Sequence, residues 1–283
     1  MNGRIAIMKD VAALSLEVKD ALLGSLLRSL GSALVAFSGG VDSTFLLKRA
    51  QQELGDRVTA VTAASETFPS REFDAAVKLA SDMKVTHLLT EISELDNRAF
   101  VANAPDRCYH CKKGLYAHLK RLAAEHGLPY MLDGTNLDDL GDYRPGLMAK
   151  TEEGVRSLLL EAGMTKDDIR ALSKELKLPT WNKPSFACLS SRIPYGTPID
   201  REKIDRLDKS EQYLLDLGFY QVRVRHHGEI ARLELMPRDM AKAIEHHHSI
   251  ASALQSFGFK YVTLDLQGYR TGSMNEMLPK GGA

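Results

Sequence analysis

Residues 38–43 read Ser38-Gly39-Gly40-Val41-Asp42-Ser43 and lie between an apolar run at 33–37 and a helical pattern that begins after them. Phosphate binding requires backbone N–H groups that converge at a helix N-terminus, where the helix dipole is positive. Glycines let the backbone approach an anion closely, and serines add hydroxyl donors. The spacing matches neither G-x-x-x-x-G-K nor G-x-G-x-x-G. The segment therefore predicts a phosphate loop of another type; the alternative is a plain Gly-Gly turn.

Strand and helix patterns alternate around this loop. Apolar, strand-like runs occupy 33–37, 57–63, 84–90 and 129–133, and helical patterns occupy 43–54, 70–82, 109–126 and 165–177. Thr165 and Asp168 are placed as a capping box for the last helix. This alternation predicts an α/β fold with a parallel sheet covered by helices on both faces.

The second half has a different pattern. Residues 179–200 contain four prolines and little periodicity; a helical pattern at 201–217 follows and ends before Gly218. Alternating runs at 219–225 and 229–235 predict a hairpin, followed by a helix at 237–256 and a strand at 260–266. We expect a parallel-sheet domain at 1–180 and a smaller α+β domain at 181–283, in which 181–200 form an active-site loop.

The composition excludes some classes of protein. The chain has 283 residues, with 37 Lys plus Arg against 37 Asp plus Glu. This balance gives no overall field that favours nucleic acid or a membrane surface. No apolar run approaches the roughly 20 residues of a spanning helix, and the N-terminus lacks a signal-peptide pattern. We expect a cytoplasmic protein whose three cysteines do not form a disulfide framework.

A second candidate nucleotide segment, Asp133-Gly134-Thr135-Asn136, follows the fourth strand run. Open α/β sheets bind ligands at the carboxyl edge of their strands, where this segment is expected to lie. An ordinary strand-to-helix turn is the alternative. The acidic residues that follow, Asp138, Asp139 and Asp142, could hold Mg²⁺ or form a solvated acidic turn.

The cysteines form two groups. Cys108 and Cys111 are three residues apart at the start of a predicted helix, so both sulfurs share one face. Such a pair fits a structural zinc site completed by histidines, a redox pair or part of an iron–sulfur site. Cys188 lies in a proline-bounded polar loop near Arg192. That setting favours a reactive thiol over a buried, inert one.

The phosphate loop resembles that of the PP-loop, or N-type ATP pyrophosphatase, superfamily, which reads SGGxDS. The resemblance implies binding of ATP, release of pyrophosphate and formation of an adenylate, with Asp42 helping to place Mg²⁺. The adenine is expected between the first two strands. The residues expected to contact the nucleotide are Ala36, Ser38, Gly39, Gly40, Asp42, Ser43, Gly134, Thr135 and Asn136.

Six segments together resemble the LarE family of ATP-dependent sulfur transferases: SGGVDS, PDRCYHCK, GTNLDDLGDYRPG, KPSFACLSSRIPYG, VRVRHHG and GYRTGSMNE. The resemblance covers nearly the whole chain. It implies adenylation of pyridinium-3,5-biscarboxylic acid mononucleotide, a precursor of the nickel-pincer nucleotide cofactor, and replacement of its carboxylate oxygens by sulfur. It also suggests a homo-oligomer.

Two sulfur sources occur in that family. Some members give up the sulfur of a cysteine equivalent to Cys188, and others hold a 4Fe–4S cluster through three cysteines. The pattern here implies the cluster, with Cys108, Cys111 and Cys188 as ligands. Three thiolates leave one iron without a cysteine ligand, which can carry an extra sulfide. Sacrifice of Cys188 remains the alternative.

Substrate contacts are expected from arginines in the second half. Arg192, Arg223 and Arg225 can bind a phosphate or carboxylate through paired N–H groups. Arg223 and Arg225 share one strand face; the alternative is two exposed strand charges. Similarity to the family also implies substrate contacts from Ser191, Glu211 and Glu234. The residues expected to act in catalysis are Cys188, Asp42 and Arg192.

Three other functions fit parts of the sequence. A tRNA-thiolating PP-loop enzyme would need a basic surface, which the neutral composition does not favour. A nucleotide-binding regulator could use the C-x-x-C pair as a redox or zinc sensor. An amidating ligase would leave Cys188 without a role. The histidine run 246–248 would spread over different faces of a helix, so we interpret it as a surface feature.

Overall fold

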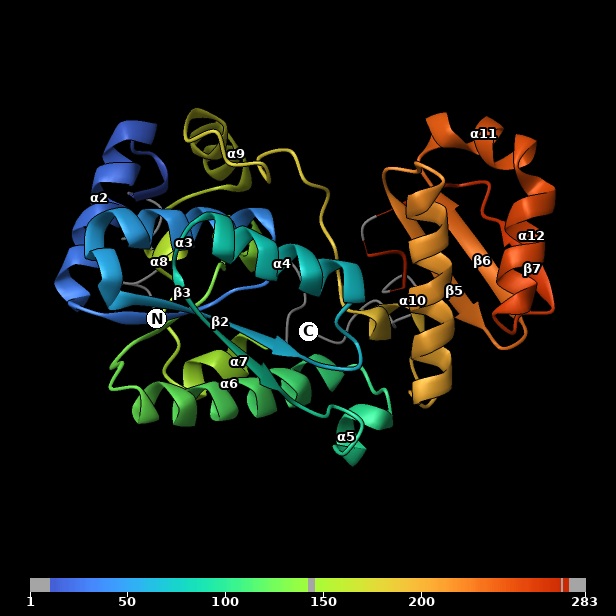
Figure 1. Cartoon of the computed structure of the whole chain (residues 1–283), viewed down its shortest axis with the longest axis horizontal. Helices are drawn as coiled ribbons and strands as arrows, with labels where there is room; N and C mark the ends of the chain where they lie inside the picture. The colour runs from blue at the N-terminus through green and yellow to red at the C-terminus, as the bar shows by residue number, and fades with distance from the viewer. Residues whose placement is uncertain (1–10, 142–145, 271, 275–283) are drawn as a thin grey trace. The chain divides into compact units, whose positions relative to one another are not determined.

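The computed structural model describes residues 11–141, 146–270 and 272–274 (Figure 1). Asp142 and parts of the segments quoted for the family resemblance lie outside these residues. The chain forms two compact units. Unit 1 comprises the residues up to Ala64, Glu72–Ile92 and Cys108–Ser185, and unit 2 comprises Ser65–Arg71, Ser93–Arg107 and the residues from Phe186 onward. The units are thus discontinuous in sequence, and the boundary expected after residue 180 stays a prediction.

Unit 1 contains the predicted parallel sheet. Its strands are β1 (Ala33–Ala36), β2 (Val58–Ala64), β3 (Thr86–Glu91) and β4 (Met131–Leu132), in the order β3-β2-β1-β4. All three neighbouring pairs are parallel, as the alternation of strand and helix patterns predicts. The α/β fold class is therefore confirmed, although β4 is shorter than the predicted run 129–133.

Helices cover both faces of this sheet, so its strands are apolar on both sides. The helices assigned to unit 1 or shared with it are α2 (Leu16–Leu30), α3 (Val41–Leu54), α4 (Ser70–Asp82), α6 (Arg107–Glu125), α7 (Gly146–Glu152), α8 (Leu158–Glu161) and α9 (Lys166–Glu175). Figure 1 shows α3 and α4 on one face and α6 and α7 on the other. Val35 packs into the core with α2 and α3, while its neighbour Leu34 packs with Tyr116 of α6.

Local signals set the ends of several helices. Thr165 caps α9 and Asp168 bonds back to the Thr165 N–H, which confirms the predicted capping box. The Asp168 carboxylate also pairs with Lys19 of α2 at 2.7 Å. Two short 3₁₀ helices, η1 (Gly55–Arg57) and η2 (Leu137–Gly141), complete the regular structure described in unit 1.

Unit 2 is built on a three-stranded sheet in the order β5-β6-β7. Its strands are β5 (Val222–His227), β6 (Ile230–Leu235) and β7 (Tyr261–Leu264), and its helices include α5 (Arg98–Val101), α10 (Arg201–Asp216), α11 (Met240–Glu245) and α12 (His247–Ser256). β5 and β6 form the predicted antiparallel hairpin, and β7 runs parallel to β6. Helices α10 and α12 pack together against β5 and β7 (Figure 1).

One predicted helix is wrong. The pattern at 237–256 predicts a single helix, but the chain forms a 3₁₀ turn, η4 (Pro237–Asp239), then α11 and α12. His246, with φ −92° and ψ 13°, lies at the break. Histidine is a weak helix former, so the run of three does little to keep the helix continuous. Residues 246–248 are exposed, which confirms their interpretation as a surface feature. Within the described chain, no helix has the length and apolar character needed to cross a membrane.

Candidate functional site

The phosphate loop (residues 38–43) joins β1 to α3 in unit 1. Gly40 is the N-cap of α3, with extended dihedral angles of φ −78° and ψ 171°. The Thr44 N–H makes the first helical bond, to Gly40 O at 3.0 Å. The N–H groups before Thr44 therefore lie at the helix N-terminus, where an anion can accept from them. Ser38 and Ser43 lie beside them, with their hydroxyl oxygens 3.2 Å apart.

Gly39 is needed for two reasons. Its φ of +67° lies in the left-handed region, which favours glycine. A Cβ at this position would also lie 3.0 Å from Ala76 Cα on α4. The loop is therefore fixed between its own turn and a neighbouring helix, which holds the donors in place before any ligand binds.

The nucleotide turn (residues 133–136) packs directly on the phosphate loop. A Cβ on Gly134 would lie 3.0 Å from Ser43 N, so the two backbones meet closely only because this residue is glycine. The Asn136 side-chain amide donates to Asp42 Oδ1 at 3.3 Å. Thr135 Oγ1 donates to Asp133 Oδ2 at 2.8 Å. The structure thus brings together two segments that are about ninety residues apart.

A lysine that sequence reasoning missed pairs with Asp42. Lys166 Nζ, from the first turn of α9, forms an ion pair with Asp42 Oδ2. Burial raises the pKa of Asp42 above its usual value, although Lys166 opposes that effect. The two residues are 124 positions apart. No pattern among neighbouring residues could therefore have predicted this ion pair.

A second missed lysine lies at the loop. Lys183 Nζ donates to Gly39 O at 3.2 Å and pairs with Glu72 of α4 at 2.6 Å. Lys183 lies in the KPSFAC segment, but the sequence pattern of that segment assigns no role to the lysine. Two ammonium groups therefore lie at the phosphate loop of unit 1, each paired with a carboxylate.

Asp133 is the centre of a buried polar network beside the turn. Its carboxylate accepts from the hydroxyls of Ser157 and Tyr116, and Lys150 bonds to Ser157. Burial lowers the pKa of Lys150, while Asp133 opposes that shift. A buried network of this kind fixes side-chain positions when its groups are paired. The network therefore fixes the nucleotide turn at its first residue, Asp133.

The acidic residues after the turn make turn contacts. Asp138 Oδ2 accepts from Lys166 N at 2.7 Å, and Asp139 Oδ2 accepts from Asn136 N at 3.0 Å. Both bonds stabilise the backbone, as the acidic-turn alternative implies. Asp42 is the carboxylate at the loop itself, so it is the better candidate for a Mg²⁺ ligand.

All three cysteines are described, and none forms a disulfide. Cys108 and Cys111 are half-buried in the first turns of α6, three residues apart as predicted. They belong to unit 1, whereas Cys188 belongs to unit 2. Across residues 11–141, 146–270 and 272–274, no group of three or more His, Cys, Asp or Glu side chains is arranged to hold a metal ion.

Cys188 begins the short 3₁₀ helix η3 (Leu189–Arg192) in unit 2. Its Sγ lies 2.9 Å from Ser190 Oγ. Its carbonyl accepts from Ser191 Oγ at 2.9 Å and from Arg192 Nη1 at 3.0 Å. The next amide, Leu189 N, donates to Thr67 O at 2.8 Å. The cysteine is thus held by its backbone, while its sulfur contacts a hydroxyl.

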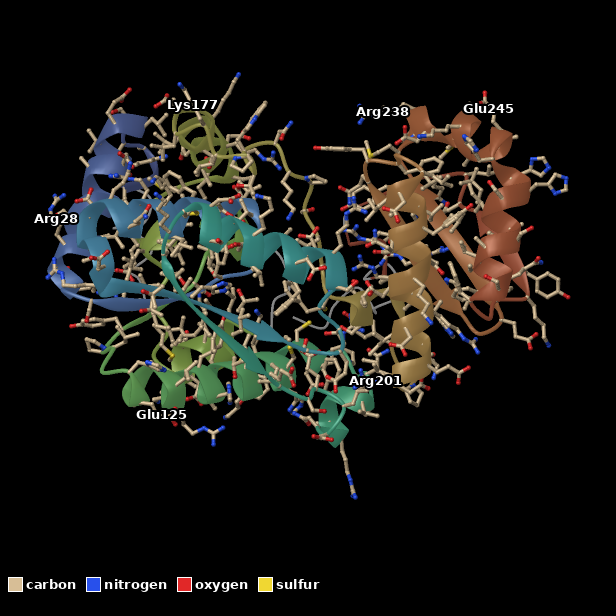
Figure 2. All side chains as sticks on the ribbon, in the orientation of Figure 1. Arg28, Glu125, Lys177, Arg201, Arg238 and Glu245 are labelled. Atoms are coloured by element: carbon tan, nitrogen blue, oxygen red, sulfur yellow. The ribbon has the colours of Figure 1, made fainter. Side chains whose placement is uncertain are left out.

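The predicted substrate arginines are buried, so the alternative of exposed strand charges is wrong. Arg192 is 1% exposed and Arg225 is 5% exposed. Arg192 binds Glu211 through Nε at 2.8 Å and Nη2 at 2.7 Å. By contrast, Arg238 of the same unit, labelled in Figure 2, is exposed. Burial alone would raise the pKa of Glu211, but Arg192, Arg223 and the Val224 N–H together lower it below its usual value.

The cluster carries more positive than negative charge. Arg192, Arg223 and Arg225 lie with Glu211 and Glu234, since Arg225 Nη2 donates to Glu234 at 2.7 Å and Arg223 interacts with both Arg192 and Glu211. Burial, together with the charge of Arg192, lowers the pKa of Arg223. Arg225 Nε has no hydrogen-bond partner among the described residues. An anionic ligand would supply both an acceptor and the missing charge.

The chain is similar in sequence to several known proteins. The asparagine synthase family matches residues 17–134, from α2 to the nucleotide turn. The chain is 45% identical over 267 residues to a pyridinium-3,5-bisthiocarboxylic acid mononucleotide synthase of Lactiplantibacillus plantarum, covering 94% of this chain and 97% of the relative. It is 42% identical to an uncharacterised protein of Synechocystis, covering 94% and 100%. It is 29% identical to a glutamine-hydrolysing GMP synthase of Aeropyrum pernix, covering 66% and 40%.

Proposed function

Because the chain belongs to the LarE family of PP-loop sulfur transferases, we propose that it converts the carboxylates of pyridinium-3,5-biscarboxylic acid mononucleotide to thiocarboxylates, at the expense of ATP. The observation that carries the proposal is the 45% identity to a bisthiocarboxylic acid mononucleotide synthase over 94% of the chain. The glycine-dependent phosphate loop supports it, because an ATP-dependent enzyme of this family needs such a site.

Activation of the carboxylate comes first. A carboxylate oxygen is a poor leaving group, so joining it to AMP makes acyl transfer feasible. The α3 N-terminus with Ser38 and Ser43 would bind the departing pyrophosphate. Asp42 would hold Mg²⁺, which offsets charge on the phosphates when it is bound. The part-buried Asp42 carboxylate fits a cation, because an ammonium group already lies against it.

Recognition of the substrate is assigned to the buried arginines of unit 2. The N–H donor at Arg225 Nε, which has no partner among the described residues, and the excess of guanidinium groups suit the phosphate or second carboxylate of the substrate. Ser191, Glu211 and Glu234 hold these arginines in place: Ser191 O accepts from Arg225 at 3.0 Å. The carboxylates therefore contact the substrate through the arginines that they orient.

The sulfur source is proposed as a 4Fe–4S cluster held by Cys108, Cys111 and Cys188. The kind and number of the donors suit such a group: there are three thiols outside disulfides, two of them on one helix face. When bound, the cluster supplies an iron without a cysteine ligand that can carry sulfide. The Sγ of Cys188 near the Ser190 hydroxyl also fits transfer of the cysteine's own sulfur.

Anaerobic incubation with ATP, Mg²⁺ and the pyridinium dicarboxylate nucleotide tests the proposal. We expect pyrophosphate release and a product in which sulfur replaces carboxylate oxygen, measured by mass spectrometry. Asp42→Ala should abolish pyrophosphate release. Pyrophosphate formation without any gain of sulfur by the nucleotide would reject the proposed function.

The two sulfur routes differ in the protein itself. With the cluster, anaerobically purified chain should be brown and contain about four irons per chain, and the mass of the apoprotein should not change on turnover. With sacrifice of Cys188, the protein should lose the elements of H₂S at that residue. Stoichiometric zinc without iron would reject the cluster.

A further inference from the structure

The pairing of Asp42 with Lys166 occupies the carboxylate on which the proposed cation site depends. Lys166 Nζ lies against Oδ2, and the Asn136 amide donates to Oδ1 at 3.3 Å. A carboxylate binds Mg²⁺ through its oxygens. Both oxygens are therefore in contact with positive or donor groups in the nucleotide-free chain.

We infer that Lys166 competes with the divalent cation for Asp42, so that the cation enters only together with the triphosphate. The inference rests on the proposed function, since it takes Asp42 as the cation ligand. A lone Mg²⁺ must displace the Lys166 ammonium group from Asp42, its ion-pair partner. A bound triphosphate supplies negative charge for both the metal ion and the Lys166 ammonium group. Lys166 therefore still has a counter-charge after Mg²⁺ takes its place at Asp42.

A purely structural salt bridge would explain the pair less well. The side chains are part-buried, at 34% and 23% exposed, so solvent still screens the pair and limits its contribution to stability. Helix α9 is already anchored by its Thr165 capping box and by the Lys19–Asp168 pair, in which Lys19 is 6% exposed. The position of α9 therefore does not depend on the side chain of Lys166.

The backbone of Lys166 is fixed while its side chain has room to move. Lys166 N donates to Asp138 Oδ2 at 2.7 Å, which holds the start of α9. Four side-chain torsions separate that backbone from the ammonium group, so Nζ can leave Asp42 without any motion of the helix. Asp139 adds negative charge near Asp42, as its effect on the Asp42 pKa indicates. A cation is thus favoured at this position whether it is Lys166 or the metal.

Binding of Mn²⁺ to the metal-stripped, nucleotide-free chain tests the inference, with free Mn²⁺ measured by electron paramagnetic resonance at pH 8 and low salt. Lys166→Met should bind Mn²⁺ at least about fivefold more tightly than the wild type, because the competing charge is gone. Lys166→Arg should bind as weakly as the wild type. Lys78→Met removes an exposed lysine that pairs with Asp82 in α4 and should change nothing.

Two further measurements separate the possible causes. Adding Asp42→Asn to Lys166→Met should remove the tight site, which assigns it to Asp42 and not to the cysteines. Should Lys166→Met fail to fold, Lys166→Gln replaces it, with circular dichroism as the check. Equal Mn²⁺ affinity in the wild type and in a folded variant that lacks the charge, Lys166→Met or Lys166→Gln, would overturn the inference. Pyrophosphate release is assayed separately, so a failed competition with intact release leaves the proposed function standing.

Discussion

At the scale of single residues, Gly39 offers the most direct test of the phosphate loop. Gly39→Ala would strain a backbone at φ +67° and press a methyl group against Ala76 at 3.0 Å. We expect a loss of about 2–4 kcal/mol in the free energy of unfolding, from left-handed strain plus overpacking. ATP affinity should fall as well, because the loop must move. Urea unfolding and calorimetry measure the two effects.

Gly127 is the matched control. It has nearly the same φ, +66°, but nothing lies within 4 Å of the position of its Cβ. Gly127→Ala should therefore cost only about 1–2 kcal/mol of backbone strain and leave ATP affinity unchanged. Equal losses in the two variants would mean that the contact with α4 does not shape the loop.

Because of His226, we expect the folded chain to lose stability in acid. It is 3% exposed, packs on Phe259, and has no hydrogen-bond partner for either ring nitrogen among the described residues. Burial, then Lys203 and Arg206, lower its pKa, with Asp200 opposing them. The unfolded chain therefore binds this proton more readily, so stability falls as pH drops below about 6.5, the ordinary histidine pKa.

The variant His226→Leu should lose less stability than the wild type between pH 7.5 and pH 5.5. Thermal unfolding across that interval measures the difference. The exposed His248, on α12, provides the control, and His248→Leu should follow the wild type. Parallel pH profiles for His226→Leu and the wild type would show that His226 is not the sensitive group.

At the scale of elements, Asn103 holds the segment that follows Cys188. Its Nδ2 donates to the carbonyls of Pro194 at 2.8 Å, Thr197 at 2.9 Å and Ile193 at 3.3 Å. Asn103→Asp keeps the shape and tolerates its φ of +54°, but sets a carboxylate oxygen against three carbonyls. We expect a loss of at least about 2 kcal/mol in the free energy of unfolding. Faster alkylation of Cys188 should accompany it.

The control lies six residues earlier on the same segment. Asn97 is the N-cap of α5, and its side chain accepts from Ala99 N at 3.0 Å and Phe100 N at 3.3 Å and donates no hydrogen bond within the described residues. Aspartate is equally good at this position. Asn97→Asp should therefore be neutral; a loss as large as that of Asn103→Asp would mean that any charge on this segment is destabilising.

These contacts show which features a sequence can reveal. Strand runs, the phosphate loop and the Thr165 capping box depend on neighbours within a few residues, so their patterns are visible. The pairing of Lys166 with Asp42 and the contact of Asn103 with 193–197 join residues far apart in sequence. Each partner alone resembles an ordinary surface lysine or a turn asparagine. The burial of Arg192 and Arg225 was hidden for the same reason, because it depends on partners in α10 and β6.

At the scale of the whole molecule, unit 2 is completed by two segments that precede it in the chain. Residues 65–71 and 93–107 contribute backbone bonds to the Cys188 region: Thr67 O accepts from Leu189 N, and Val101 O accepts from Ile199 N, at 2.8 Å and 2.9 Å. They also contribute ion pairs to α10, among them Arg71 with Asp216 at 2.7 Å. A contiguous C-terminal piece lacks all of these partners.

A fragment that begins at residue 181 should therefore keep the sheet of unit 2 but lose the ordered structure around Cys188. In a fragment of residues 181–283, α10 still meets β5, since Val224 N donates to Glu211 Oε1 at 2.9 Å within the fragment. We expect β5 and α10 amides to keep their protection against hydrogen exchange. The amides of Leu189, Gly196 and Ile199 lose their acceptors and should exchange rapidly. Full-length chain under the same conditions provides the reference, and equal protection of these three amides in the fragment would show that the earlier segments are dispensable for the Cys188 loop.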